Sequence, residues 1–356
     1  MKDLSSGTAK RICGLDLGDK KSQVCLCNLQ GEVLEQVRVN TTEQGLARVF
    51  QNCAPIKIAL ETGTHSPWVS RLLRKWGHEV VVANPRKVRL IGNSRRKNDR
   101  IDALTLADLV SFRPRLLHPI QHVSAQAQAD RGVLRARDAL VKARSGLINH
   151  ARGLVKALAG RLPSCSAEAF ARKAVLAIPP ELASALMPLI EQIDQINKTI
   201  QLYDRQIAEL MRTRYPETQK LRQINGVGPI TALAYVLCLE DPHRFRKSRS
   251  VGAYLGLVPA QQDSGEANPQ LGISKEGNPF VRRLLVQCAQ YTLGPFGKDS
   301  DLRRFGLRIA ANRGKNAKKR ALVAVARKLS VVMHRLLVND EPYQALRGEA
   351  QLQPAA

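Results

Sequence analysis

The sequence is poor in aromatic residues. Phe, Trp and Tyr make up 4% of the 356 residues, and only two of them are Trp. Proteins that hold single-stranded nucleic acid by stacking bases need aromatic platforms, so base-by-base stacking is not expected of this chain. Acidic residues are also scarce, because 30 Asp and Glu stand against 56 Lys and Arg and leave a formal charge of +26. Such an excess predicts a polyanionic partner that is held mainly through its phosphates.

Two further absences limit the class of protein. The seven cysteines are odd in number and include no C-x-x-C pair and no adjacent His cluster, which argues against a disulfide framework and a structural zinc site. No apolar run approaches the roughly 18 residues of a membrane span, and the first eleven residues lack the apolar core of a secretory signal. We therefore expect a soluble protein of a reducing compartment, cytoplasmic and associated with the nucleoid, with no membrane partner.

The first part of the chain predicts an α/β domain. Short alternating runs separated by Gly-containing turns indicate a β-meander, and later apolar runs alternate with helical patterns. The expected strands are 12–17, 22–28, 33–39, 57–60 and 78–83, and the expected helices are 42–51, 68–76 and one that begins near Asp99.

Four acids occupy particular places on this predicted frame. Asp16 ends the first strand, Glu61 follows the fourth, and Asp99 and Asp102 share one face at the start of a helix, just after Arg95-Arg96-Lys97. Hard cations such as Mg²⁺ prefer several oxygen ligands, and two such ions can clamp the attacking and leaving oxygens of a phosphodiester. Any one of these acids is explained equally well as a turn or cap residue. Taken together, they predict a metal site for Mg²⁺, with Mn²⁺ as the alternative.

The middle of the chain predicts long helices. Residues 124–162 carry Val133, Leu140, Leu147 and Leu154 seven apart, and Leu182 to Leu210 show apolar residues in steps of four and three. A coiled coil is expected, either with the first helix of the same chain or between subunits. A plain helical hairpin within one chain is the alternative. Pro188 predicts a kink or a later helix start.

The second half of the chain carries the basic residues. Gly226-Val-Gly228 is typical of a helix-hairpin-helix turn, and equally of an ordinary glycine turn between helices. Residues 302–338 hold eleven Lys and Arg and no acid, interleaved with apolar residues at helical spacing. This pattern favours a phosphate-tracking surface over a membrane-surface helix. The expected nucleic-acid contacts are Arg95, Arg96, Lys97, Arg244, Arg246, Lys247, Arg249, Lys318, Lys319 and Arg320.

Two groups of motifs are similar to those of a known family. The first comprises Gly14-Leu-Asp-Leu-Gly18, Ala59-Leu-Glu-Thr-Gly-Thr64, Val82-Ala-Asn-Pro85 and Lys97-Asn-Asp-Arg-Ile-Asp-Ala103. The second comprises Ile224-Asn-Gly-Val-Gly-Pro-Ile-Thr-Ala232, Tyr254-Leu-Gly-Leu-Val-Pro259, Asp263-Ser-Gly265 and Gly272-Ile-Ser-Lys-Glu-Gly277. Together they resemble the DEDD transposases of insertion sequences, the bridge-RNA-guided serine recombinases, over nearly the whole chain.

The resemblance implies a fold of class α/β plus α. Its parts are an RNase H-like (RuvC-like) domain over 1–118, a helical coiled-coil linker over 119–215, a mainly helical transposase domain over 216–345 and a disordered tail over 346–356. By position, Asp16, Glu61, Asp99 and Asp102 resemble the metal-binding tetrad, and Ser264 resembles the nucleophile that attacks DNA. The implied partners are DNA of the element ends and target, a structured noncoding guide RNA, and further copies of the chain in a dimer or tetramer.

Two other functions are compatible with the same residues. In a metal-dependent nuclease or junction resolvase, the acids would activate water and Ser264 would be a turn residue, as loop serines beside glycine usually are. In an architectural protein with a degenerate domain, binding would be salt-sensitive and no metal-dependent cleavage would occur. The full set of four acids argues against this last interpretation.

Overall fold

The structure is a computed structural model that describes residues 11–84, 98–261, 271–312, 314 and 316–347. The chain divides into two compact units, residues 1–125 and residues 126–356. Each unit has its own core and is described by itself. No helix among the described residues is both long and apolar enough to cross a bilayer.

The first unit is built on a mixed five-stranded sheet of order β3-β2-β1-β4-β5. The first three strands are antiparallel neighbours, whereas β4 and β5 run parallel to β1. This arrangement agrees with the predicted meander followed by strand–helix alternation. The elements are β1 (Arg11–Asp16), β2 (Lys21–Asn28), β3 (Val33–Asn40), α1 (Glu43–Phe50), β4 (Lys57–Glu61), α2 (Ser66–Lys75), β5 (Glu79–Ala83), α4 (Asp99–Phe112) and the 3-10 turn η1 (Pro114–Leu117).

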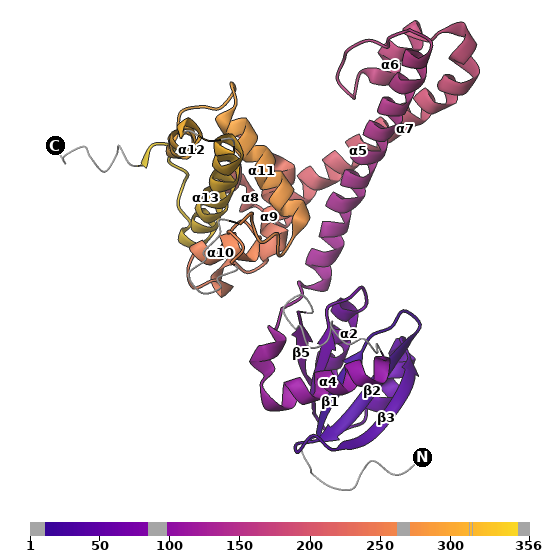
Figure 1. Cartoon of the computed structure of the whole chain (residues 1–356), viewed down its shortest axis with the longest axis vertical. Helices are drawn as coiled ribbons and strands as arrows, with labels where there is room; N and C mark the ends of the chain where they lie inside the picture. The colour runs from indigo at the N-terminus through magenta and orange to yellow at the C-terminus, as the bar shows by residue number, and fades with distance from the viewer. Residues whose placement is uncertain (1–10, 85–97, 262–270, 313, 315, 348–356) are drawn as a thin grey trace, which may run out of the picture. The chain divides into compact units, whose positions relative to one another are not determined.

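Helices cover both faces of this sheet (Figure 1). Successive side chains of a strand point to opposite faces, and Cys13 and Leu15 of β1 accordingly pack with α1 and α2. On the other face, Ile12 of β1 and Ala59 of β4 pack with α4. The alternation therefore assigns Gly14, Asp16 and Glu61 to the face that α4 covers.

α4 lies in backbone contact with β1. A Cβ atom added at Gly14 would lie 1.8 Å from the carbonyl oxygen of Ala103 and 2.7 Å from the amide nitrogen of Ala107. Both neighbours are backbone atoms of α4, so no side-chain rotation could relieve the overlap. Only glycine at position 14 allows this approach, which brings the first turns of α4 onto the end of β1.

The second unit is mainly helical. It begins with the long helices α5 and α7, which lie side by side with α6 at one end (Figure 1). A smaller helical bundle follows, in which α9 is buried along most of its length. The elements are α5 (Ala125–Ala157), α6 (Phe170–Ala174), η2 (Val175–Ala177), η3 (Pro180–Leu182), α7 (Ala183–Thr213), α8 (Thr218–Arg222), α9 (Pro229–Leu239), η4 (Pro242–Arg244), α10 (Arg249–Tyr254), α11 (Pro279–Leu293), α12 (Asp301–Ala311) and α13 (Ala317–Asn339).

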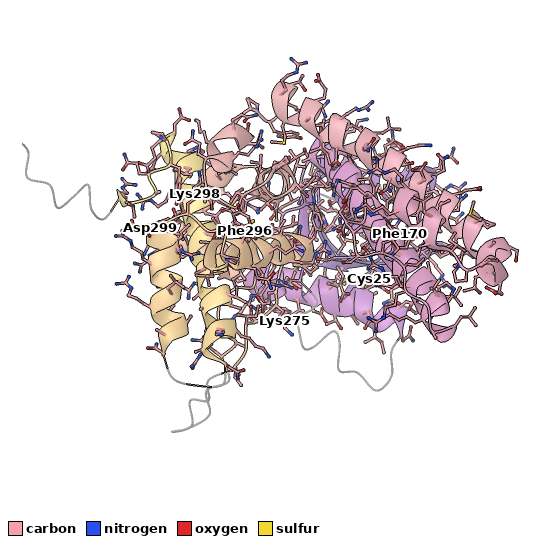
Figure 2. The ribbon with its side chains drawn as sticks, turned by 90° about the horizontal axis from the view of Figure 1, so that it is seen from above. Cys25, Phe170, Lys275, Phe296, Lys298 and Asp299 are labelled. Atoms are coloured by element: carbon pink, nitrogen blue, oxygen red, sulfur yellow. The ribbon has the colours of Figure 1, made fainter. Side chains whose placement is uncertain are left out.

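α5 and α7 pair in antiparallel fashion within one chain. Arg137 donates to Asp204 at 2.5 Å, and about two turns further along α5 the guanidinium of Arg144 donates to Asn197 at 2.7 Å. At the end near α6, apolar residues of both helices close the core around Phe170, which is labelled in Figure 2. The predicted seam of α7 therefore packs on α5 of the same chain. α7 begins at Ala183 and continues through Pro188.

The buried stripe of α5 lies one position away from the predicted seam, whereas that of α7 agrees with the predicted seam in part. On α7, Leu186, Ile193, Ile200, Ile207 and Leu210 are buried as expected, but Ile190 and Asn197 are buried in place of the predicted Leu189 and Ile196. On α5, Leu134, Ile148 and Val155 are buried instead of Val133, Leu147 and Leu154. The reason is that polar residues occupy seam positions, including Arg144 and Asn197, and counting apolar residues passes over them.

A buried carboxylate joins the start of α5 to the end of α7. Asp130 is 5% exposed and accepts hydrogen bonds from Arg214 and from the Tyr215 hydroxyl, each at 2.7 Å. Burial alone would raise the pKa of Asp130, but the bonds from Arg214, Tyr215 and Gln126 outweigh burial and lower it. The cluster therefore contains a carboxylate that is held in its charged form.

We expect Gly14→Ala to destabilise the first unit by at least about 3 kcal/mol, because α4 would have to move off the sheet. Gly63→Ala is the matched control, since a Cβ there meets nothing within 4 Å. Thermal unfolding of the full chain, monitored for residues 1–125 by hydrogen exchange of the β1 amides, checks this. Equal protection in the two variants would contradict the close contact.

We expect Asp130→Asn to lower the free energy of unfolding of the second unit by about 1.5–3 kcal/mol at pH 7. Because the folded pKa lies below the unfolded value of about 3.9, this stabilisation is present above that pH and is lost as pH falls through the folded pKa. Urea melts at several pH values should show the two proteins converging in acid. Asp194→Asn, which removes an exposed pair with Lys198, should change little at any pH.

Candidate active site and nucleic-acid interface

Two of the four predicted acids end neighbouring parallel strands. Asp16 is the last residue of β1 and Glu61 the last residue of β4. The register pairs Leu15 with Leu60, so the next residue on each strand is one of these acids. Both belong to the face covered by α4, and Oε1 of Glu61 is buried from solvent. Two carboxylates therefore stand side by side at the carboxyl edge of the sheet.

The other two acids lie in the first turn of α4. Asn98 caps this helix by accepting a hydrogen bond from the Arg100 amide at 3.1 Å. Asp102 is 9% exposed and immediately precedes Ala103, whose carbonyl oxygen lies against Gly14. Asp99 is exposed, and its carboxylate lies 3.9 Å from the guanidinium of Arg38 on β3. Asp102 is thus buried next to the contact between α4 and β1, whereas Asp99 is exposed and pairs with β3.

The donor chemistry of these acids suits a hard divalent cation, because all four are carboxylates. Within the described residues, however, no three His, Cys, Asp or Glu side chains form a group that could hold a metal ion. The structure places Asp16 and Glu61 on the face that α4 covers and Asp102 in the first turn of α4, and it keeps Asp99 in an ion pair with Arg38. Arg95, Arg96, Lys97 and Ser264 lie outside the described residues.

The loops that follow these strand ends are joined to each other. Nε2 of His65 lies 3.3 Å from a carboxylate oxygen of Asp19, and Nδ1 of His65 accepts a hydrogen bond from Trp68 at 3.0 Å. Asp19 follows Asp16 by three positions and His65 follows Glu61 by four. The sequence analysis missed this pair, because the two partners are far apart in the chain and form no motif.

A basic groove lies in the second unit. It is a pocket of about 1170 Å³ between α13, the start of α10 and the chain at residues 257–259 and 271–273. Its described lining includes no acid, and apolar side chains such as Val323 and Phe305 lie between the cations. The cations that line it are Lys247, Arg249, Lys319, Arg320, Arg327, Lys328 and Arg335.

The groove contains some of the predicted nucleic-acid contacts and not others. Lys247, Arg249, Lys319 and Arg320 line it. Arg246 and Lys318 are exposed elsewhere on the unit. Arg327, Lys328 and Arg335 also line the groove, although they were not among the predicted contacts. Their spacing from Arg320 along one face of α13 is the signal that would have found them.

Arg244 has a different environment from its basic neighbours. Its guanidinium lies over the rings of Phe245 and Tyr254, with centroid distances of 4.7 and 4.8 Å, and its Nη2 is buried. Burial raises the pKa of Tyr254, so the ring beneath Arg244 stays a neutral phenol. This packing orders the segment that leads to Lys247. The same segment is fixed to α13, because buried His334 contacts the Ser248 hydroxyl at 2.9 Å.

The described residues on either side of the Ser264 segment form one wall of the groove. Pro259 and Ile273 pair as an antiparallel bridge, and Leu257, Pro259, Leu271, Gly272 and Ile273 are all lining residues. Residues 262–270 themselves lie outside the described part. The chain therefore enters and leaves that segment beside the basic groove.

Comparisons with known proteins assign both units to one family. Residues 13–159 match a family model described as a transposase, the DEDD transposase of the IS110 type, and residues 218–300 match the transposase IS116/IS110/IS902 family. A transposase for insertion sequence element IS1328 of Yersinia enterocolitica is 30% identical over 284 residues, which cover 78% of this chain and 83% of the relative. The chain belongs to the IS110 family of transposases.

Other transposases are similar over most of their length. One for insertion sequence element IS1111A of Coxiella burnetii is 28% identical over 354 residues, or 97% of this chain and 92% of the relative. A probable family 20 transposase of Pseudomonas aeruginosa is 28% identical over 306 residues, or 83% of this chain and 88% of the relative. The predicted family is thus confirmed. The first matched region of this transposase contains all four acids, and the second contains the segment with Ser264.

We expect Lys319→Gln with Arg327→Gln to weaken DNA binding by this transposase and to flatten its dependence on salt. If both side chains contact duplex phosphates, the slope of log K against log salt should fall by about 1.8, since each contact contributes about 0.9. Lys318→Gln with Arg308→Gln removes the same charge from exposed positions outside the groove lining. Fluorescence anisotropy with labelled element-end DNA at several salt concentrations checks this, and identical slopes for the two double variants would contradict the groove assignment.

Proposed function

We propose that this transposase cuts and rejoins DNA through a phosphoserine intermediate formed at Ser264. The observation that carries the proposal is the basic groove, because the chain on both sides of the Ser264 segment forms its wall. A DNA strand held on the cations of the groove would run past that segment. The resemblance of Asp263-Ser264-Gly265 to the family motif supports the same residue.

The chemistry of a covalent intermediate suits transposition. Attack of the Ser264 hydroxyl oxygen on a phosphodiester forms a new phosphoester, and the 3′ oxygen of the DNA leaves with a proton. The energy of the broken bond is kept in the phosphoserine, so a second DNA end can reverse the step and be joined. A nuclease gives the phosphate to water and loses that energy. Free serine is a weak nucleophile, and a base must therefore accept its proton.

We propose that Asp16, Glu61, Asp99 and Asp102 hold the divalent metal of the reaction, Mg²⁺ or Mn²⁺. Such ions would supply charge stabilisation to the phosphoryl oxygens. The position of Asp16 and Glu61 on the face that α4 covers, with Asp102 in the first turn of α4, supports this assignment. Asp99 would have to leave Arg38 to join them, which an exposed pair at 3.9 Å permits at little cost. The strand order supports an RNase H-like, RuvC-like fold for the first unit.

The remaining partners also belong to the proposal. The family resemblance supports guidance by a structured bridge RNA and assembly of the chain into a dimer or tetramer. The net charge of +26 suits contact with more than one nucleic acid. Arg95, Arg96 and Lys97 precede the two acids of α4, where they would contact the backbone of DNA at the acidic site.

We expect Ser264→Ala and Asp16→Ala each to abolish a covalent DNA–protein adduct. The assay incubates the protein with element-end DNA, the flanking transcript and Mg²⁺, then separates products under denaturing conditions. Ser264→Ala removes the nucleophile, whereas Asp16→Ala removes one carboxylate of the acidic set. Ser250→Ala, an exposed serine of α10, is the control and should form the adduct normally.

One result would replace this mechanism with another. Cleavage that survives in Ser264→Ala without an adduct, but is lost in Asp16→Ala, would indicate a nuclease or junction resolvase that uses water. Strong salt-sensitive binding with no cleavage in any variant would indicate a DNA-binding protein without catalysis.

A further inference from the structure

The Ser264 segment is carried on a short two-limbed stem, which we define as residues 255–260 and 272–276. The Ala260 amide donates to Gly272 O at 2.8 Å, the Ser274 amide to Val258 O at 2.9 Å, and the Lys275 amide to Gly256 O at 3.2 Å. Lys275 is labelled in Figure 2. These bonds form a small antiparallel ladder, whose open end leads into the segment with Ser264.

A single guanidinium ties the closed end of this stem. Nη1 of Arg282 donates to the carbonyl oxygen of Leu255 at 3.0 Å and to that of Glu276 at 2.6 Å. One acceptor belongs to each limb. Arg282 stands in the first turn of α11, and Asn278 caps this helix by accepting bonds from the Phe280 and Val281 amides. The base of the stem is therefore attached to a 15-residue helix of the bundle.

At this base the backbone of one limb lies directly against the backbone of the other, with no room for a Cβ atom between them. A Cβ at Gly277 would lie 1.9 Å from the carbonyl oxygen of Tyr254, and a Cβ at Gly256 would lie 2.2 Å from that of Glu276. Both glycines also have positive φ, 71° and 66°. This geometry leaves the Leu255 and Glu276 carbonyls side by side, and Arg282 satisfies both.

We propose that Arg282 is a positioning residue for the serine chemistry of this transposase. The inference rests on the proposed function of Ser264. By fixing both limbs to α11, Arg282 sets the direction in which the stem presents its open end to the basic groove.

The planar fork of arginine suits this task. Two carbonyl oxygens that face one side chain need two donors in a fixed arrangement, which a guanidinium supplies with little loss of freedom. Without it, two partly buried acceptors lose their partner and the limbs can separate. Rates of displacement reactions fall about 10²-fold when the reacting atoms are misplaced by about 1 Å. Loss of Arg282 should therefore affect adduct formation far more than DNA binding.

The same domain provides a matched control. Nη1 of Arg303, on α12, also donates to two backbone carbonyls, those of Thr292 and Gly294, at 2.5 and 2.7 Å. These acceptors lie at the end of α11, beside the turn that contains Phe296 and Lys298 in Figure 2. Arg303→Gln removes the same chemistry from a place that does not hold the stem.

The experiment compares wild type, Arg282→Gln, Arg282→Lys and Arg303→Gln in two measurements. Hydrogen exchange of the Ser274 and Lys275 amides reports on the stem. Single-turnover formation of the DNA–protein adduct, together with anisotropy of labelled element-end DNA, separates chemistry from binding. We expect Arg282→Gln to raise stem exchange and to slow adduct formation at least tenfold at unchanged DNA affinity. Arg282→Lys should recover part of the rate, and Arg303→Gln should match wild type in both measurements.

Each other outcome overturns a defined part of the proposal. Unchanged stem exchange in Arg282→Gln would show that the arginine does not hold the limbs. Faster exchange with an adduct rate equal to that of Arg303→Gln would show that the stem does not position the serine. If wild type cuts DNA without forming an adduct, the proposed serine chemistry fails and the positioning role fails with it, whereas the exchange result still decides whether the stem is held.

Discussion

Contact between backbone and backbone, which only glycine permits, governs both regions where we place the chemistry. At Gly14, the carbonyl of Ala103 occupies the space that a side chain would need, and this brings Asp102 to the strand end that carries Asp16. At Gly277, the carbonyl of Tyr254 does the same at the base of the stem. Close packing of this kind has no adjustable side chain in it, so the groups on either side are held to a fraction of an ångström. Precise placement therefore comes from the main chain, and in the first unit Asp16 and Asp102 lie within two residues of the contact.

Positive charge is the second constraint, because the groove gathers cations that repel one another. Repulsion of this kind costs free energy unless packing holds the elements together. α13 meets this requirement with a buried apolar face that includes Val325, Leu329 and Met333, while its opposite side bears cations. Aromatic rings help at two places, since Lys328 lies over Phe305 and Arg244 lies over Phe245 and Tyr254. Some of the few aromatic residues of this chain thus make cation–π contacts with Lys and Arg of the same domain.

Much of the fold was predictable, and the failures have a common cause. The strands and the first helices followed from alternation and from turn residues, because each depends on neighbours close in sequence. The seam of α5 was predicted one position away from its buried stripe, and that of α7 was predicted only in part. The reason is that Arg144 and Asn197 bond to each other across the pair and occupy positions that an apolar count leaves empty. The contacts of Arg282 and the Asp19–His65 pair were missed for a related reason. Their partners are backbone carbonyls or distant loop residues, which no spacing in the sequence can indicate.

The placement of the acids and of Ser264 in different compact units has a mechanistic consequence. A phosphodiester reacts only where the nucleophile and the charge-stabilising groups meet at one phosphate, and neither unit contains both sets. In the first unit the acids share an edge but form no complete group of metal ligands within the described residues, since Asp99 is paired with Arg38. In the proposed mechanism, phosphates of bound DNA would compete for Arg38 and release Asp99 toward the other acids. Assembly of the active site on the nucleic acid, and not in the free protein, would keep an enzyme that cuts DNA inactive until its substrate is in place.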